Sequence, residues 1–283
     1  MRPFTTLIDV AALRELPRTD LALFDCRAEL GSPQWGETQF AEAHIPGAQF
    51  LHLDRDLSSP ITATSGRHPL PDPHVLARRL GELGVGADTQ IVGYDQGNGA
   101  YAARLWWLAR WIGHSRVAVL DGGIAAWRAA GLPLESTRTV PQPRELAVRL
   151  DTRAVVDAAA VDELRRRPAN LLVDARAAER FAGRNETIDP VAGHVPGARN
   201  HPFAGNLGAD GRFLPPDELR TRWLTLLGSR EPAELVAMCG SGVTACHNLL
   251  ALEHAGLGGG RLYGGSWSEW IRDPRRPVAT GTY

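Results

Sequence analysis

Short apolar runs alternate with longer amphipathic stretches along most of the chain, and turn residues separate them. Runs of four or five apolar residues between turn signals are typical of buried strands, whereas apolar positions three or four residues apart are typical of helices. This alternation predicts an α/β fold whose sheets are mainly parallel and flanked by helices. We expect strands at 21–25, 90–94, 117–120, 171–174, 235–238 and 261–263, and helices at 73–83, 100–112, 216–227 and 243–255.

The pattern occurs twice, with the same motifs in the same order. Residues 21–27 resemble 171–176, because each segment is an apolar run that ends in Asp-x-Arg, and both 44–48 and 194–198 read His-x-Pro-Gly-Ala. Two further pairs follow in order, 91–94 with 235–238 and 121–127 with 264–270. Four ordered matches at similar spacing indicate two copies of one domain.

The length of the chain agrees with a duplication. Its 283 residues exceed the usual size of a single hydrophobic core. We expect one domain at 1–140 and the other at 150–283, with a linker around 134–152, where Pro141 and Pro143 interrupt the apolar pattern.

Composition and charge exclude several classes of protein. A net charge of -1 gives no general attraction to nucleic acid or to a membrane surface. Three cysteines do not make a disulfide framework, and no His/Cys cluster has the spacing of a zinc site, so we expect neither a metal nor another cofactor. The N-terminus lacks the apolar core of a signal peptide and no apolar run reaches 18 residues, so we expect a cytoplasmic protein.

Candidate chemistry follows the expected strand at 235–238, where the sequence reads Cys239-Gly-Ser-Gly-Val-Thr. In parallel sheets, ligand sites lie at the carboxyl ends of strands. Gly240 and Gly242 allow a tight turn with inward N–H groups, and the following helix adds the positive end of its dipole. Such surroundings lower the pKa of a thiol from ~8.5 to roughly 3.5–7.5. Cys239 is therefore the candidate nucleophile; the alternative, a buried small residue, leaves the two glycines without a purpose.

The matching loop of the first copy carries Asp95 where the second carries Cys239. A carboxylate cannot replace a thiol as the nucleophile, so we expect no chemistry in the first domain. We expect Asp95 to accept hydrogen bonds at the start of the next helix.

Together these motifs resemble the rhodanese superfamily, and specifically its tandem-domain sulfurtransferases. The resemblance runs from about residue 7 to Tyr283 and rests on the paired Asp-x-Arg and His-x-Pro-Gly-Ala motifs, the loop that begins at Cys239, and the segment 264–270. It implies two rhodanese-like domains, the first without a catalytic cysteine. It also implies that Cys239 carries sulfur as a persulfide, passed from a small donor to cyanide or a thiol, without a cofactor.

The family offers two donors, 3-mercaptopyruvate and thiosulfate. Mercaptopyruvate enzymes resemble this chain in the loop Cys-Gly-Ser/Thr-Gly-Val-Thr, whereas thiosulfate enzymes carry Arg-Lys where Gly240 and Ser241 stand here. Arg180 matches the family's substrate-binding arginine. Mercaptopyruvate enzymes usually have a second arginine nine residues later, but this chain has Asp189 there, and Arg184 is the candidate replacement.

Several other residues carry expectations. Ser241 is expected to bind a donor oxygen or to move a proton, or else to cap the loop, and the mercaptopyruvate resemblance suggests that His44 approaches it. His44 and His194 otherwise tie their turns to neighbouring backbone. Val243 and Thr244 are expected to shape the substrate- and persulfide-binding loop where the helix begins.

Two other functions remain open. A non-catalytic rhodanese-like binding protein would suit the first copy, but not the intact loop of the second. A phosphatase of the related fold needs Cys-x5-Arg to bind phosphate, and the sixth residue after Cys239 is Ala245. The leading prediction is a sulfurtransferase that uses 3-mercaptopyruvate, with thiosulfate as the alternative donor; the oligomeric state is left open.

Overall fold

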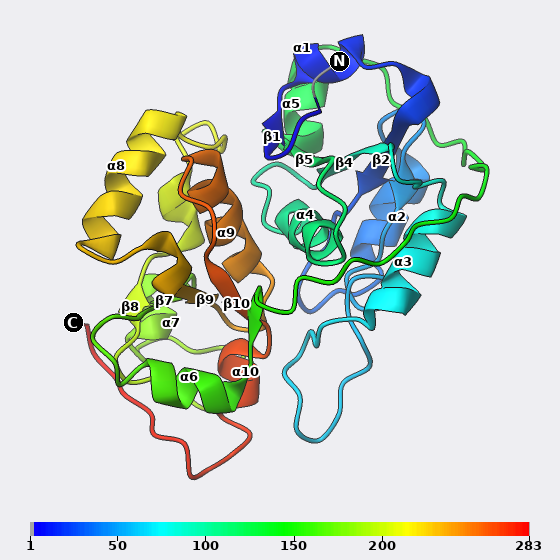
Figure 1. Ribbon diagram of the computed structural model, residues 1–283. Coiled ribbons are helices and arrows are strands. Elements are labelled where there is room, and N and C mark those ends of the chain that lie inside the picture. The colour runs from blue at the N-terminus through cyan, green and yellow to red at the C-terminus, as the bar shows by residue number, and fades with distance from the viewer. Residues whose placement is uncertain (1–2, 283) are drawn as a thin grey trace. The chain divides into compact units, whose positions relative to one another are not determined.

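The computed structural model describes residues 3–282, so Tyr283, the last residue of the span that resembles the family, lies outside the described residues. The chain divides into two units (Figure 1). Among the described residues, unit 1 holds those up to Ser59, Pro71–Asp151 and Ala209–Phe213, and unit 2 holds Pro60–Leu70, Thr152–Gly208 and those from Leu214 onward. Each unit therefore contains one short segment from the other half of the sequence.

Unit 1 is built on a five-stranded parallel sheet in the order β1-β5-β4-β2-β3. Helices cover it, as expected for a parallel sheet whose strands are apolar on both sides. Its strands are β1 (Leu7–Ile8), β2 (Leu21–Asp25), β3 (Gln49–Phe50), β4 (Gln90–Tyr94) and β5 (Val117–Leu120). Its helices are α1 (Val10–Glu15), α2 (Trp35–Glu42), α3 (Pro73–Glu82), α4 (Ala102–Trp111) and α5 (Gly123–Ala129), with the 3-10 turn η1 (Arg18–Asp20).

Unit 2 repeats this topology, with a five-stranded parallel sheet in the order β6-β10-β9-β7-β8. Helices α8 and α9 lie on one side of the sheet and α6 and α10 on the other (Figure 1). Its strands are β6 (Val155–Val156), β7 (Leu171–Asp174), β8 (Arg199–Asn200), β9 (Leu235–Met238) and β10 (Arg261–Tyr263). Its helices are α6 (Ala158–Leu164), α7 (Ala178–Phe181), α8 (Pro216–Leu227), α9 (Thr244–His254) and α10 (Ser266–Trp270), with the 3-10 turns η2 (Phe203–Asn206) and η3 (Pro232–Glu234).

The predicted α/β fold is confirmed. All six predicted strands are present at the predicted residues, and the four predicted helices are α3, α4, α8 and α9, with ends that differ by two residues at most. Aspartates fix several helix starts, because their carboxylates accept backbone N–H groups that lack a partner within the helix. Asp9 accepts the N–H of Ala12 and Asp157 accepts that of Ala160, both at 2.8 Å, so the capping residue is also repeated in the two units.

The duplicated motifs make the same contacts in both units. Arg27 and Arg176 each form a buried ion pair with the aspartate two residues earlier. In both pairs Nε and Nη2 donate to the carboxylate, and Nη2 lies 2.7 Å from Oδ2. His44 and His194 each bond a backbone carbonyl through Nδ1 and stack on a phenylalanine. The expectation that both histidines secure their turns is therefore confirmed. The buried charges of the two Asp–Arg pairs are compatible with the core, because each charge is paired and hydrogen-bonded.

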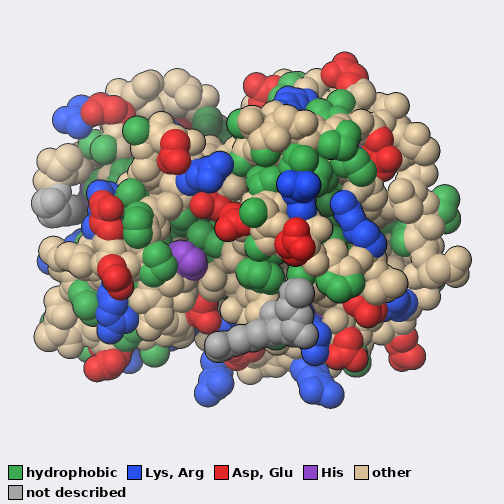
Figure 2. All heavy atoms as spheres, turned by 90° about the horizontal axis from the view of Figure 1, so that it is seen from above, with side chains coloured by type: hydrophobic (Ala, Val, Ile, Leu, Met, Phe, Trp, Pro, Cys, Tyr) green, Lys and Arg blue, Asp and Glu red, His purple; other side chains and the backbone are tan. Residues whose placement is uncertain are grey.

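Surface charge is mixed. On the face shown in Figure 2, acidic and basic side chains are interspersed rather than gathered by sign. Among the described residues, no helix is long and apolar enough to cross a membrane.

Candidate active site

Cys239 stands between β9 and α9, and the loop that follows it wraps around its sulfur. We call residues 239–243 the Cys239 loop. The N–H groups of Ser241 and Gly242 point at the Cys239 Sγ, at 3.4 and 3.1 Å from nitrogen to sulfur. The sulfur is buried, since Cys239 is 2% exposed. Two backbone donors directed at one sulfur stabilise a negative charge there, and a persulfide in the same place is also anionic.

Helix α10 holds the loop in this shape. The Cys239 N–H donates to Ser266 Oγ at 3.0 Å, and the Cys239 carbonyl accepts the N–H of Trp267 at 3.0 Å. Ser266 itself has a φ of 54°, which is unusual for a residue other than glycine. A strained backbone that persists must be held by its surroundings, and here the Ser266 hydroxyl accepts from the Cys239 N–H and donates to the Tyr263 carbonyl at 2.9 Å.

Different constraints favour glycine at the two glycine positions of the loop, Gly240 and Gly242. Gly242 has a φ of +80°, and a Cβ on it would lie 2.2 Å from the Gly264 carbonyl oxygen. Only glycine fits both the conformation and the space. At Gly240 the constraint comes from side chains, because a Cβ there would lie 2.8 Å from Arg67 Nη2 and 3.6 Å from the terminal nitrogens of Arg180. Two guanidinium groups therefore lie directly against the loop.

Arg67, Arg180, Glu186 and Asp189 form a group that we call the arginine–carboxylate cluster. Asp189 bridges the two arginines, since its carboxylate pairs with Arg67 and lies 3.0 Å from Arg180 Nη2. Arg180 also donates through Nε to both oxygens of Glu186, at 3.0 and 3.1 Å. The cluster thus places two guanidinium groups beside the Cys239 loop, and carboxylates hold them in position.

Burial and pairing shift the pKa values of this cluster in different directions. Burial raises the pKa of Asp189 above its usual value, although Arg67 and Arg180 act against it. Burial would also raise the pKa of Glu186, but hydrogen bonds from Arg180 and from the N–H groups of Asp189 and Ile188 lower it overall. Glu186 is therefore the more firmly ionised carboxylate of the two.

The segment 60–70 brings two residues to the loop from far away in the sequence. His68 Nδ1 lies 2.7 Å from Ser241 Oγ, and both side chains are buried. The Arg67 N–H donates to Ser268 Oγ at 3.0 Å, which fixes the segment against α10. A hydroxyl bonded to an imidazole is placed to pass a proton to or from a group bound beside the sulfur.

Most predicted site residues meet at this point. Cys239, Gly240, Ser241 and Gly242 form the loop, Val243 ends it, and Thr244 is the first residue of α9. The guanidinium group of Arg180 lies against Gly240, so Arg180 stays a candidate for substrate binding.

Two expectations are corrected. His44 is not the partner of Ser241, because its ring nitrogens face the carbonyls of Phe40 and Thr137, at 2.7 and 3.2 Å, and His68 makes that contact instead. Arg184 does not join the cluster: it pairs with Glu179 and is 59% exposed in its side chain. Sequence reasoning missed Arg67 and His68, since segment 60–70 matches no motif of the second copy.

The corresponding loop of unit 1 is closed around a carboxylate. Asp95 is fully buried, and its two oxygens accept the N–H groups of Gly97, Gly99, Tyr101 and Ala102 at 2.9–3.2 Å. The expectation that Asp95 satisfies the start of the next helix is confirmed. The anion-binding loop has been kept in both copies, but in unit 1 a fixed side chain fills it.

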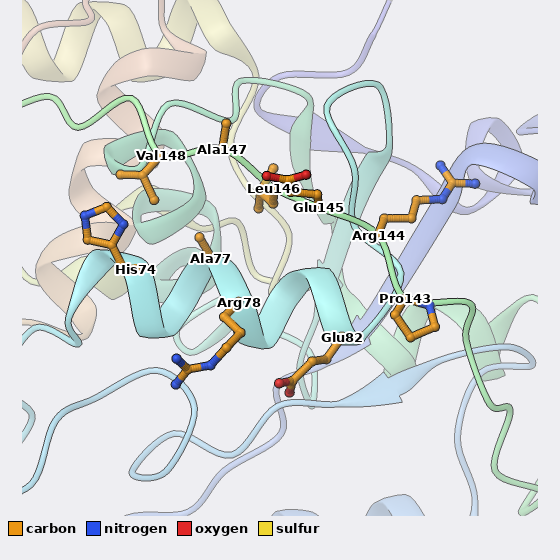
Figure 3. Close-up of a pocket in the computed structure, with 10 residues that line it drawn as sticks. All are labelled: His74, Ala77, Arg78, Glu82, Pro143, Arg144, Glu145, Leu146, Ala147 and Val148. Atoms are coloured by element: carbon orange, nitrogen blue, oxygen red, sulfur yellow. The ribbon is translucent and has the colours of Figure 1, made fainter.

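A separate pocket of about 620 Å³ lies in unit 1, between α3 and residues 143–148 (Figure 3). Its lining mixes charged side chains such as Arg78, Glu82 and Glu145 with apolar ones such as Leu146 and Val148. It contains no cysteine, so the sulfur chemistry expected of Cys239 has no place there.

Comparison with known proteins agrees with this geometry. The family model "Rhodanese-like domain" matches residues 9–130 and 157–273. The chain is 53% identical over 268 residues to the "Probable 3-mercaptopyruvate sulfurtransferase" of Pseudomonas aeruginosa, covering 94% of each chain. It is 36% identical to a thiosulfate sulfurtransferase of Cricetulus griseus, covering 86% of this chain and 83% of that one. Among solved structures, 3-mercaptopyruvate sulfurtransferase from Leishmania major matches with a TM-score of 0.83 and 32% identity, covering 95% of this chain and 76% of that one. The chain therefore belongs to the rhodanese-like family, as a sulfurtransferase with two rhodanese-like domains.

Proposed function

We propose that this protein transfers sulfur from 3-mercaptopyruvate to cyanide or a thiol through a persulfide on Cys239. The reaction is a nucleophilic displacement in two halves. In the first half, the Cys239 thiolate attacks the donor sulfur, the carbon–sulfur bond breaks, and its electron pair leaves on the pyruvate enolate. In the second, the acceptor attacks the outer sulfur, the sulfur–sulfur bond breaks, and the Cys239 thiolate is restored.

The observation that carries the choice of donor is the contact between His68 and Ser241. Departure of the enolate needs a proton, and the proton lost from the donor sulfur has to be moved. His68 Nδ1 and Ser241 Oγ, 2.7 Å apart, are placed to take that proton and deliver it to the enolate carbon. Thiosulfate would release sulfite, which needs no proton to leave. Proton transfer by His68 and Ser241 would therefore not be required with that donor.

Arg180 and Arg67 are the proposed binding groups for the donor carboxylate. Forked guanidinium donors suit carboxylate oxygens, and both groups lie against Gly240 beside the sulfur. The N–H groups of Ser241 and Gly242 would stabilise the thiolate before transfer and the persulfide after it. Val243 and Thr244 complete the loop at the start of α9. The similarity to the Pseudomonas aeruginosa protein supports the same donor.

Residues 150–283 are the proposed catalytic domain, and segment 60–70, which belongs to unit 2, adds Arg67 and His68 to it. The rest of residues 1–140 is proposed to have no chemistry of its own, because Asp95 fills its loop. Transfer needs Cys239 as a thiol, and no disulfide joins cysteines among the described residues. We therefore place the protein in a reducing compartment, the cytoplasm.

Thiosulfate is the second candidate donor. Asp189 stands where mercaptopyruvate enzymes usually have a second arginine, which weakens the resemblance to them at that position. The neutral residues Gly240 and Ser241 argue the other way, because a doubly charged donor is better bound by a loop that carries cations.

The test is a comparison of the two donors. Thiocyanate formation is measured from 3-mercaptopyruvate and from thiosulfate at equal concentrations, and mass spectrometry follows one added sulfur on Cys239. We expect faster turnover with 3-mercaptopyruvate and no added sulfur in Cys239→Ser. His68→Gln should lower turnover with 3-mercaptopyruvate by about 10²-fold or more, as for loss of a general acid–base group, while turnover with thiosulfate changes far less.

The exposed His74→Gln is the matched control, since it removes a histidine from α3. A persulfide that forms without Cys239 would refute the mechanism. Equal loss with both donors in His68→Gln would refute the assigned proton transfer.

A further inference from the structure

Asp189 occupies an unusual position for an acidic residue in a site that must bind anions. Its side chain is buried to 2% exposure, and its two oxygens lie on Arg67 and on Arg180. These are the same two guanidinium groups that lie against Gly240 of the Cys239 loop. The carboxylate therefore already holds the cations that a donor anion would use.

The charges around the loop balance before any donor arrives. Three arginines, Arg67, Arg176 and Arg180, lie there with three carboxylates, those of Asp174, Glu186 and Asp189. Asp174 forms a buried ion pair with Arg176, which donates to it through Nε and Nη2. Glu186 accepts hydrogen bonds from Arg180 and from two backbone N–H groups. Of these three carboxylates, only Asp189 accepts no backbone N–H group from the described residues, so its hydrogen bonds come from Arg67 and Arg180 alone.

A second observation indicates that the cluster is built to bind something more. The Nε of Arg67 is buried and has no hydrogen-bond partner among the described residues. A buried donor without a partner is costly, and such atoms call for an explanation. A donor carboxylate placed between Arg67 and the Cys239 loop would accept from the unused side of this guanidinium.

We propose that Asp189 determines donor specificity, by competing with the donor for Arg67 and Arg180 and by repelling a doubly charged donor more than a singly charged one. The inference rests on the proposed function, because it concerns the donor of that reaction. Coulomb repulsion between Asp189 and the donor scales with the donor's charge, and it is strong in a site with little water. At neutral pH, thiosulfate carries two negative charges and 3-mercaptopyruvate carries one on its carboxylate. Asp189 thus opposes thiosulfate about twice as strongly, and the enzyme prefers the carboxylate donor.

The test removes the charge while keeping the size of the side chain. Asp189→Asn is compared with wild type for kcat/KM with each donor at low ionic strength. We expect kcat/KM to rise with both donors, and to rise about tenfold more with thiosulfate, so that the preference shifts toward the dianion. Asp189→Glu keeps the charge and should keep the wild-type preference.

Asp162→Asn is the matched control. Asp162 also pairs with two arginines, Arg165 and Arg166, but on helix α6 at the surface. It should leave the ratio of the two donors unchanged. Thermal unfolding of each variant checks that the fold is kept.

Three outcomes would overturn the inference. A higher KM for both donors in Asp189→Asn would mean that Asp189 positions the arginines rather than competes for them. An unchanged donor ratio, or the same shift in Asp162→Asn, would mean that its charge does not select the donor. Failure of the proposed function is a separate result, since wild-type protein would then form no persulfide from either donor.

Discussion

Replacement of Gly242 by alanine tests whether the N–H groups of the Cys239 loop hold the reactive sulfur. The residue has a φ of +80°, so alanine would adopt a backbone conformation that costs about 1–2 kcal/mol. Its Cβ would also lie 2.2 Å from the Gly264 carbonyl oxygen, where ordinary contacts begin at 3.4 Å. Either backbone must therefore move by about 1.2 Å, the difference between these two distances.

A shift of that size breaks the bond from the Gly242 N–H to Cys239 Sγ, which is 3.1 Å long. Loss of one backbone-type donor to a developing anion typically lowers kcat by about 10²–10³-fold. We expect that loss in Gly242→Ala, together with a loss of about 2–5 kcal/mol in the free energy of unfolding from strain and overpacking. Rapid mixing with 3-mercaptopyruvate and mass spectrometry of Cys239 measure the rate of persulfide formation, and urea unfolding measures stability.

Gly131→Ala separates strain from the effect on the sulfur. Gly131 has a φ of +68°, and a Cβ there would have no atom within 4 Å. It should lose about 1–2 kcal/mol of stability and keep its rate. A wild-type rate of persulfide formation in Gly242→Ala would refute the idea that the loop stabilises the sulfur.

Three further predictions follow from particular contacts. Asp95→Ala should lower the free energy of unfolding by about 3 kcal/mol or more in urea, because buried N–H groups lose their acceptor. Gly240→Ala should raise KM for 3-mercaptopyruvate with little change in stability, since its Cβ would push aside the flexible side chain of Arg67. Asp273→Asn should lower Tm at pH 6 but not at pH 2: Arg275 lowers the pKa of Asp273 from 3.8 to about 2, so the stabilisation is present above pH 3.8 and lost as pH falls through about 2.

Each of these predictions has its own check. A stable Asp95→Ala would mean that the loop of unit 1 rearranges without cost. A KM that stays constant in Gly240→Ala would separate Arg67 from donor binding. A Tm difference for Asp273→Asn that persists at pH 2 would show that it does not arise from the ionised carboxylate.

The six strands could be predicted because each consists mostly of buried apolar residues between turn signals; β10, which begins with the half-buried Arg261, has the shortest such run. The shorter strands β1, β3, β6 and β8 were not predicted, since two residues carry no periodicity. Helices such as α7 and α10 have only four or five residues, so the packing of Phe181 and Trp267 into the core defines them rather than an amphipathic pattern.

The Cys239 loop was predictable from local sequence, because the glycines that shape it are neighbours of Cys239. His68 and Arg67 were not, because nothing in the local sequence of segment 60–70 indicates that it packs against α10. The resemblance to mercaptopyruvate enzymes suggested His44 as the partner of Ser241, but its ring nitrogens contact the backbone carbonyls of Phe40 and Thr137. The pairing of Asp189 with two arginines likewise depends on tertiary contacts that no spacing reveals.

Each unit contains a short segment from the other half of the sequence. During translation, neither unit can therefore be completed until residues from both halves of the chain have been synthesised. His68 leaves the ribosome 173 residues before Ser241, so it must wait for its partner. Unit 1 in turn receives Ala209–Phe213, whose Phe213 N–H bonds Asp121, only after most of the polypeptide has been made. Contacts over such long sequence separations form late. A nascent chain that stops at the linker would therefore leave both units incomplete, because segment 60–70 would lack unit 2 and unit 1 would lack Ala209–Phe213.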